Sequence, residues 1–293
     1  MSRQNFYAAR RQRQCRQLER KVVVELVREE RRIQPRLGAR KLLHLLRGPL
    51  LEAKVEVGRD RFLGLLRQNG LLVERKPRTK RTTQSRHGLP VHRNLVRENP
   101  PQGPNEVWVS DLTYVRTAEG FLYASVILDA WSRKLVGMHV GDTLESVGCQ
   151  AALREALKDL PADKRPIHHS DRGCQYCCGA YMEMLGAAGL AASMTEKNHC
   201  YENAQAERVI GILKGEYELD RNFNTKEQAR AAVRQARQLY NERRPHFALN
   251  LRTPSEVHQA GQPGMSEASA PLGSLRSPSL PLTLQHPASP PET

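Results

Sequence analysis

The feature that most constrains the fold is a change of pattern near residue 106. From there, three segments rich in apolar and β-branched residues follow one another, at residues 107–115, 121–128 and 134–140. Only short turns separate them, at residues 118–120 and 132–133. Consecutive strand-like segments with short turns pair with their neighbours. The sequence therefore predicts an antiparallel meander of three strands.

The segments after the meander alternate between two kinds of pattern. Helical patterns cover about residues 144–160, 179–188, 203–218 and 226–242, and strand-like segments lie at residues 166–170 and 190–194. Three antiparallel strands followed by alternating helices and strands form a layered α/β sheet. We therefore expect a mixed sheet of ribonuclease H-like order in a core domain at residues 106–258.

The first third of the chain carries most of the positive charge. Residues 1–100 hold 26 of the 46 Lys and Arg residues but only 9 of the 31 Asp and Glu residues. Such a surplus favours a polyanionic partner, above all nucleic acid. A basic face that serves only solubility is the alternative.

Helical patterns fill residues 1–73, with apolar stripes near residues 18–27, 39–46 and 58–69. Short basic helices with tight turns suit a helix-turn-helix-like DNA-binding domain, although any small helical bundle would give the same pattern. The third helix would offer Arg59, Arg61 and Arg67 to DNA.

The remaining segments read as connections. Residues 74–105 have no periodicity and many basic residues, so they predict a linker along phosphates, with Lys76, Arg78, Lys80 and Arg81 in contact with DNA. Residues 259–293 are rich in Pro and Ser and predict a disordered tail. With no signal segment and no long apolar run, a cytoplasmic protein without a membrane partner, associated with the nucleoid when bound to DNA, is expected.

Three acidic residues stand at informative places in this layout. Asp111 lies within the apolar segment VWVSDLTYV, Asp171 follows a central strand, and Glu207 lies beside the apolar stripe of a helix. A buried carboxylate needs a cation or strong hydrogen bonds. Each acid also has a structural explanation, such as an ion pair, a helix cap or an exposed helix position. Together they predict catalytic carboxylates that could converge on one point.

Oxygen ligands of this kind suit Mg²⁺ or Mn²⁺ better than Zn²⁺. Two such ions, about 3.5 to 4 Å apart, can activate an attacking hydroxyl group and stabilise the leaving oxygen of a displacement at phosphorus. We therefore expect two ions held by Asp111, Asp171 and Glu207.

The stretch HSDRGCQYCC also permits a zinc site or a redox pair. Cys174 and Cys177 have the spacing of a metal-binding pair, and the possible further ligands are His168, His169, His199 and Cys200. A second regularly spaced pair is missing, however. Buried structural thiols are the simpler explanation.

Asp171 and Glu207 are separated by 35 residues, and the segments around them carry a resemblance. VWVSDLTYV, ILDAWSRKLVGM, HHSDRGCQY, SMTEKNHCYENAQAE and YNERRPHFALNLRTPSEV occur in the order found in insertion-sequence transposases of the OrfB (second-frame) type. Residues 20–258 resemble that family, whose catalytic core is similar to that of retroviral integrases. The resemblance implies that Asp111, Asp171 and Glu207 bind metal ions, and that Lys214 meets DNA.

The resemblance also implies a function and partners. The expected enzyme is a DDE transposase, a polynucleotidyl transferase that cleaves and joins DNA at the ends of its own element. It would act as a homo-oligomer on element ends and target DNA. The opening SRQNFY is similar to the start of a second-frame protein, so an upstream-frame protein or a frameshift fusion is expected as partner. A non-catalytic, repressor-like DNA-binding copy and a nuclease that hydrolyses without joining are the alternatives.

Overall fold

The computed structural model describes residues 3–74, 90–196 and 203–261. Within these residues the chain divides into two compact units, residues 3–74 and residues 90–261. Each unit has its own hydrophobic core. Across the described residues, no helix combines the length and apolar character needed to cross a membrane.

The first unit is helical. It consists of α1 (Arg3–Ile33), α2 (Ala39–Leu45), α3 (Arg47–Glu52) and α4 (Arg59–Gln68). Its core joins the second half of α1 to the three short helices through ten buried side chains: Val23, Val27, Leu37, Leu42, Leu46, Leu50, Val55, Phe62, Leu65 and Leu66. The alternating burial along α1 and α4 follows from their helical spacing of apolar residues.

Helix α3 was not among the helices expected from the sequence, and it contains Gly48 and Pro49. Both residues lie in the first turn of α3, where a missing N–H group leaves no helical hydrogen bond unmade. The buried side chain of Leu50 then fixes this short helix to the core.

The second unit is built on one mixed sheet. Its strands are β1 (Val107–Thr117), β2 (Gly120–Asp129), β3 (Leu135–Gly141), β4 (Ile167–Ser170), β5 (Ala192–Met194) and β6 (Asn222–Phe223). The order is β3-β2-β1-β4-β5, with β6 beside the far end of β1. β1 to β3 are antiparallel, whereas β4 and β5 run parallel to β1. This is the predicted ribonuclease H-like order, and the predicted fold class is confirmed.

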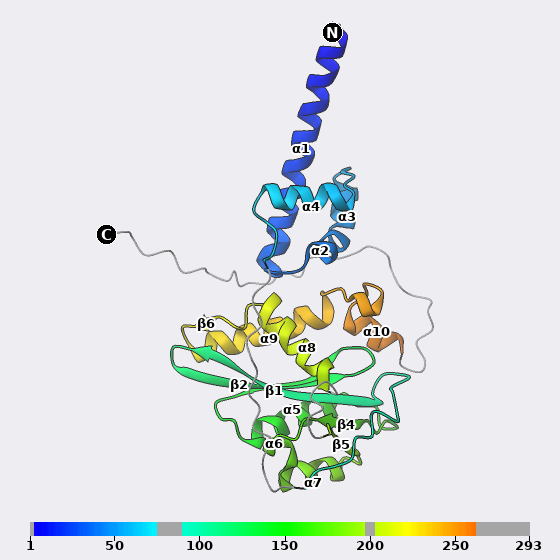
Figure 1. Cartoon of the computed structure of the whole chain (residues 1–293), viewed down its shortest axis with the longest axis vertical. Coiled ribbons are helices and arrows are strands. Elements are labelled where there is room, and N and C mark those ends of the chain that lie inside the picture. The colour runs from blue at the N-terminus through cyan, green and yellow to red at the C-terminus, as the bar shows by residue number, and fades with distance from the viewer. Residues whose placement is uncertain (1–2, 75–89, 197–202, 262–293) are drawn as a thin grey trace, which may run out of the picture. The chain divides into compact units, whose positions relative to one another are not determined.

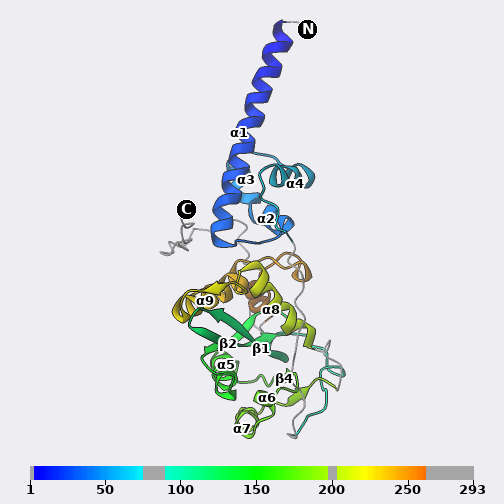
Figure 2. The ribbon, with the colours of Figure 1, turned by 60° about the vertical axis from the view of Figure 1, so that its left-hand side comes forward.

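Helices cover both faces of the sheet, as Figures 1 and 2 show. On one face lie α5 (Ser146–Lys158), α6 (Cys174–Cys177) and α7 (Gly179–Ala187), which share a core with Trp108 and Ile127. On the other face lie α8 (Ala204–Glu216), α9 (Lys226–Glu242) and α10 (Pro254–Ala260), the last preceded by the 3-10 turn η2 (Phe247–Leu249). The sheet thus has the two covered faces that buried, near-continuous apolar strands require.

One glycine permits the close packing of α5 on the sheet. A Cβ atom placed on Gly137 of β3 would lie 2.3 Å from the carbonyl oxygen of Ala152 and 3.0 Å from the Cβ of Ala156. Only glycine therefore fits at this crossing without a shift of the helix.

A buried polar network attaches α10 to the sheet. Asp129, at the end of β2, accepts hydrogen bonds from the Ser132 backbone and hydroxyl groups (2.7 and 2.6 Å) and from the Asn105 backbone (2.7 Å). The Ser132 hydroxyl is also 2.9 Å from Nδ1 of His258 on α10. Burial raises the pKa of Asp129, but the contact with His258, 3.8 Å away, and the hydrogen bonds from Ser132 and Asn105 outweigh it and leave the pKa lowered.

An ion pair joins the end of α8 to the segment after α9. Nε and Nη2 of Arg244 lie 2.7 Å from the two carboxylate oxygens of Glu216. The Arg244 side chain is almost fully buried, so this bidentate pair fixes the direction of α8.

Candidate active site

Asp111 and Asp171 each follow one residue of the same strand pair. β1 and β4 are parallel neighbours whose pairing ends at Ser110 opposite Ser170. Each aspartate is the next residue along its chain. The carboxyl ends of parallel strands are the usual place for functional groups in α/β proteins. The structure therefore brings together two of the three predicted carboxylates, one buried (Asp111) and one partly buried (Asp171).

Local backbone contacts orient both carboxylates. Oδ1 of Asp111 accepts a hydrogen bond from the N–H of Leu112 at 2.8 Å, and Oδ1 of Asp171 accepts one from the N–H of Gly173 at 3.0 Å. A Cβ atom on Gly173 would approach Oδ1 of Asp171 to 3.0 Å. Glycine at this position therefore leaves the carboxylate room beside the start of α6.

The third predicted carboxylate, Glu207, lies on α8, which covers the face of the sheet opposite α5, α6 and α7. Glu207 lies in the first turn of α8, partly exposed, beside the buried residues Ala206, Val209 and Ile210. Asn203, just before this helix, donates from Nδ2 to the carbonyl oxygen of Ser110 at 3.0 Å. This hydrogen bond fixes the start of α8 on the residue that precedes Asp111.

The three carboxylates do not form a complete set of metal ligands in the described part of the chain. In the described part of the chain, no group of three or more His, Cys, Asp or Glu side chains is arranged so that it could hold a metal ion. Asp111 and Asp171 supply the hard oxygen donors that Mg²⁺ and Mn²⁺ prefer. Glu207 stands one helical turn after Asn203, and residues 197–202 before it lie outside the described residues. The residues present thus fit a divalent metal by donor chemistry.

The groups behind the two aspartates are kept neutral by burial. Desolvation lowers the pKa of His168 to about 3, so that the ring is uncharged at neutral pH. Its Nε2 lies 2.7 Å from the Ser110 hydroxyl and 2.9 Å from the Tyr181 hydroxyl. Burial, together with nearby charges that include both aspartates, raises the pKa of Tyr176 far above its ordinary value.

The cysteines after Asp171 belong to the packing around α6. Cys177 is buried with its Sγ 3.7 Å from Sδ of Met194, whereas Cys174 is exposed. Burial raises the pKa of the Cys149 thiol, on the neighbouring helix α5, to about 11, and the thiol therefore stays protonated. The zinc alternative gains no support from the described residues. His199 and Cys200, two of its possible ligands, lie outside them.

The predicted DNA-binding residues have varied surroundings. Nζ of Lys214 lies 4.2 Å from the ring centroid of Tyr114, so the lysine rests on an aromatic face. Arg59 pairs with Asp60 at 3.0 Å and Arg61 with Glu19 at 2.6 Å, both on the surface of the helical unit. Arg67 is exposed on α4. The other four predicted contacts lie outside the described residues: Lys76, Arg78, Lys80 and Arg81.

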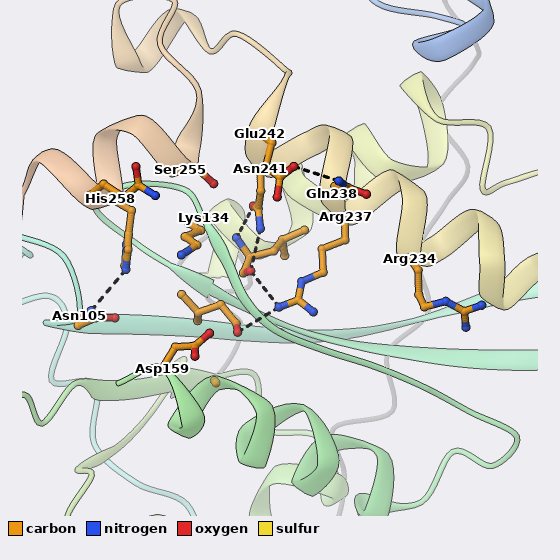
Figure 3. A pocket seen from close by; sticks show the side chains of 14 residues that line it. Asn105, Lys134, Asp159, Arg234, Arg237, Gln238, Asn241, Glu242, Ser255 and His258 are labelled. Atoms are coloured by element: carbon orange, nitrogen blue, oxygen red, sulfur yellow. Dashed lines mark hydrogen bonds between the residues drawn. The ribbon is translucent and has the colours of Figure 1, made fainter. Parts of the chain in front are cut away.

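A pocket of about 620 Å³ lies elsewhere in the second unit, between β3, α5, α9 and α10 (Figure 3). None of the predicted catalytic residues lines it. Arg237 reaches the carbonyl oxygens of Leu135 and Val136 (3.5 and 3.3 Å), and Asn241 bonds both backbone groups of Leu135. These side chains satisfy backbone hydrogen-bonding groups of the edge strand β3. Satisfied groups protect an edge strand from pairing with another chain.

Sequence reasoning missed two features beside the carboxylates. Asn203 stands four residues before Glu207, a spacing that places both on one helical face and could have been noticed. Tyr114 and Phe121 form an exposed aromatic pair with ring centroids 5.7 Å apart. That pair depends on strand register, which no single-segment pattern reveals.

Comparisons with known proteins show the family of this chain. Two family models, both described as integrase core domains, match residues 101–200 and 188–254. A 31 kDa protein of insertion element IS600 from Shigella sonnei is 37% identical over 216 residues, which are 73% of this chain and 79% of that protein. The chain belongs to the insertion-sequence transposases with an integrase core domain. The predicted family and enzyme class are confirmed.

Other relatives and structures are similar over shorter or less identical stretches. Transposase InsF of insertion sequence IS3A from Escherichia coli K12 is 36% identical over 57% of this transposase. The match spans 59% of the length of InsF. Among solved structures, the integrase catalytic core of HTLV-2 in complex with magnesium covers 54% of this chain and 98% of its own, at 19% identity and a TM-score of 0.43. The simian T-cell lymphotropic virus intasome with PP2A regulatory subunit B56 gamma covers 84% and 76%, at 16% identity and a TM-score of 0.47.

Proposed function

We propose that this transposase cleaves DNA strands at the ends of an insertion sequence and joins them to target DNA, with Asp111, Asp171 and Glu207 as its metal-binding catalytic residues. The observation that carries the assignment is the position of Asp111 and Asp171 after paired residues of neighbouring parallel strands. Glu207 lies on α8, whose start is bonded to Ser110, the residue before Asp111.

The carboxylates would hold one or two Mg²⁺ or Mn²⁺ ions. When bound, such ions activate an attacking hydroxyl group and stabilise the leaving oxygen at phosphorus. Hydrogen bonds from the N–H groups of Leu112 and Gly173 keep one oxygen of each aspartate in place. The neutral His168 and Tyr181 behind the strands add no competing positive charge.

The rest of the chain would hold DNA in position. The helical unit at residues 1–73 and the linker at residues 74–105 would grip phosphates, through Arg59, Arg61 and Arg67 and through the basic linker residues. Binding should therefore weaken steeply with salt. We also propose a homo-oligomer on DNA and an upstream-frame partner or fusion, as the sequence resemblance implies.

The decisive experiment compares Glu207→Gln with Glu227→Gln in the full chain. Glu227 is a matched control, because it is an exposed glutamate in the first turn of α9. Joining of a branched DNA substrate in Mn²⁺ should fall by roughly 100-fold or more in Glu207→Gln, since even residues that only support a metal ligand cost 10- to 100-fold. Glu227→Gln should join DNA as the parent does.

Three outcomes would contradict the proposal. Equal joining by both variants would remove Glu207 from the catalytic set. Hydrolysis without joining by the parent chain would make it a nuclease. Salt-sensitive binding with no chemistry in the parent, even with the upstream-frame protein added, would instead favour a non-catalytic binding protein.

A further inference from the structure

Two aromatic side chains are unusually exposed on the hairpin formed by β1 and β2. Tyr114 is 49% exposed and Phe121 is 50% exposed. Their rings meet edge to face, at 5.7 Å between centroids and an interplanar angle of 89°. Large exposed rings held together in this way cost hydrophobic free energy in water, so a contiguous pair marks a binding surface more often than an isolated ring does.

Positive charge accompanies the two rings. Nζ of Lys214 lies 4.2 Å from the centroid of Tyr114, a cation–π distance. Arg116 is exposed and stands directly opposite Phe121 in the strand register. We name the set of Tyr114, Phe121, Arg116 and Lys214 the hairpin patch. It combines flat apolar surfaces with cations, which is the composition of surfaces that bind single-stranded nucleic acid.

The hairpin patch shares two elements, β1 and α8, with the proposed catalytic residues. In the described chain, β4 pairs with β1 only up to Ser110, and β6 begins to pair at Arg116. Asp111 and Tyr114 both fall in the interval between these pairings, about 10 Å apart along the strand, with side chains on opposite faces of the sheet. Lys214 belongs to α8, the helix that also carries Glu207. A strand of DNA that ends at the carboxylates could therefore pass over this open edge of β1 to the patch.

Glu119, the acidic residue of the β1–β2 turn, is bonded to the start of α9. Oε2 of Glu119 accepts a hydrogen bond from the N–H of Lys226, at the start of α9. A carboxylate at a helix N-terminus is stabilised there by the helix dipole. The charge of Glu119 is therefore directed to the start of α9.

We propose that the hairpin patch binds unpaired bases of the DNA strand next to its reacting end, with a base stacked on the exposed rings and neighbouring phosphates on Lys214 and Arg116. The inference rests on the proposed function for its substrate, DNA, and goes beyond it in naming a site for separated bases. Fully paired DNA has no base face to offer to these rings. The patch should therefore favour a frayed or forked end over a paired one.

The test measures binding in the absence of divalent ions, so that it does not depend on catalysis. The probes are a forked duplex with five unpaired nucleotides at one end, the outermost carrying 2-aminopurine, and the same duplex fully paired. The full chain is compared with the double variants Tyr114→Ser/Phe121→Ser and Tyr114→Leu/Phe121→Leu. The leucine pair keeps apolar bulk and helps the hairpin to fold, but has no ring to stack. Phe247→Ser is the control, because Phe247 on η2 is also 49% exposed.

The parent chain should prefer the forked probe and quench its 2-aminopurine. Both double variants should bind the forked probe roughly 10-fold more weakly, in keeping with the loss of base stacking, and the paired probe as before. Phe247→Ser should change neither affinity. Equal losses on both probes, or no loss on either, would overturn the proposal.

A change of subunit number would also overturn it. If the double variants differ from the parent in oligomeric state without DNA, the rings form a protein interface instead. Failure of the parent to join DNA strands would count against the proposed function but not against this site, because the forked probe reports on stacking without chemistry.

Discussion

Asn203 and Ser110 join the two halves of the candidate active site through one hydrogen bond. Nδ2 of Asn203 lies 3.0 Å from the carbonyl oxygen of Ser110, and both residues are buried. Ser110 precedes Asp111 on β1, and Asn203 precedes the helix that carries Glu207. The separation between these two carboxylates is therefore set by a side chain that carries no charge.

Replacement of Asn203 by Leu should loosen this connection. The buried carbonyl oxygen of Ser110 would lose a donor, which costs about 1–3 kcal/mol of unfolding free energy. Strand joining should fall more than DNA affinity does, because the carboxylates move while the basic surfaces stay. Urea unfolding, a DNA-binding titration and a joining assay measure the three effects, with Asn224→Leu as an exposed control. Equal losses of joining and affinity would argue against a positioning role.

Stability should depend on pH through His168. Its pKa in the folded chain is about 3, against an ordinary value of 6.5. Between these values the unfolded chain takes up a proton that the folded chain excludes. The histidine therefore stabilises the fold fully above pH 6.5, and this stabilisation is lost as the pH falls towards 3, at up to about 1.4 kcal/mol per pH unit.

Urea unfolding at pH 7 and pH 4.5 tests this sign. The drop in unfolding free energy should be about 2–3 kcal/mol larger in the parent than in His168→Gln, which keeps an acceptor for Ser110 but takes up no proton. His92→Gln, at a partly exposed position, should behave as the parent does. An equal drop in parent and His168→Gln would show that other groups dominate the acid response.

Sequence patterns predicted the sheet and the main helices because their apolar spacing is strong. The expected helix at residues 226–242 coincides with α9, and the strand segments of β1 to β5 were placed within a few residues. Asp111 and Asp171 were expected to meet because each follows or interrupts a central strand. Their positions directly after the paired residues Ser110 and Ser170 depend on the parallel register of β1 and β4, which only the structure supplies.

The missed elements have physical reasons. β6 is two residues long and exists through its pairing with β1, a contact between distant segments. α10 did have a local signal: Thr253 and Glu256 form a capping box around Pro254, the first residue of the helix. Lys214 was assigned to DNA on family grounds, and nothing in its own segment indicated that Tyr114 would lie beneath it.

Two glycines of similar appearance in the sequence should respond oppositely to alanine. A Cβ atom on Gly137 would lie 2.3 Å from the carbonyl oxygen of Ala152, which belongs to helix backbone and cannot rotate away. Gly137→Ala should therefore push α5 from β3 and destabilise the fold by about 1–3 kcal/mol. Gly211, within α8, has nothing within 4 Å of its added Cβ.

Gly211→Ala should stabilise the protein by about 0.5–1 kcal/mol, because alanine loses less backbone freedom than glycine when a helix forms. Thermal or urea unfolding of the two variants and the parent measures both changes in unfolding free energy, a decrease for Gly137→Ala and an increase for Gly211→Ala. Since Gly211 is exposed and four residues after Glu207, the alanine variant should also keep its strand-joining activity. If Gly137→Ala were as stable as the parent, the close crossing of α5 and β3 could not be a constraint on the sheet that carries Asp111.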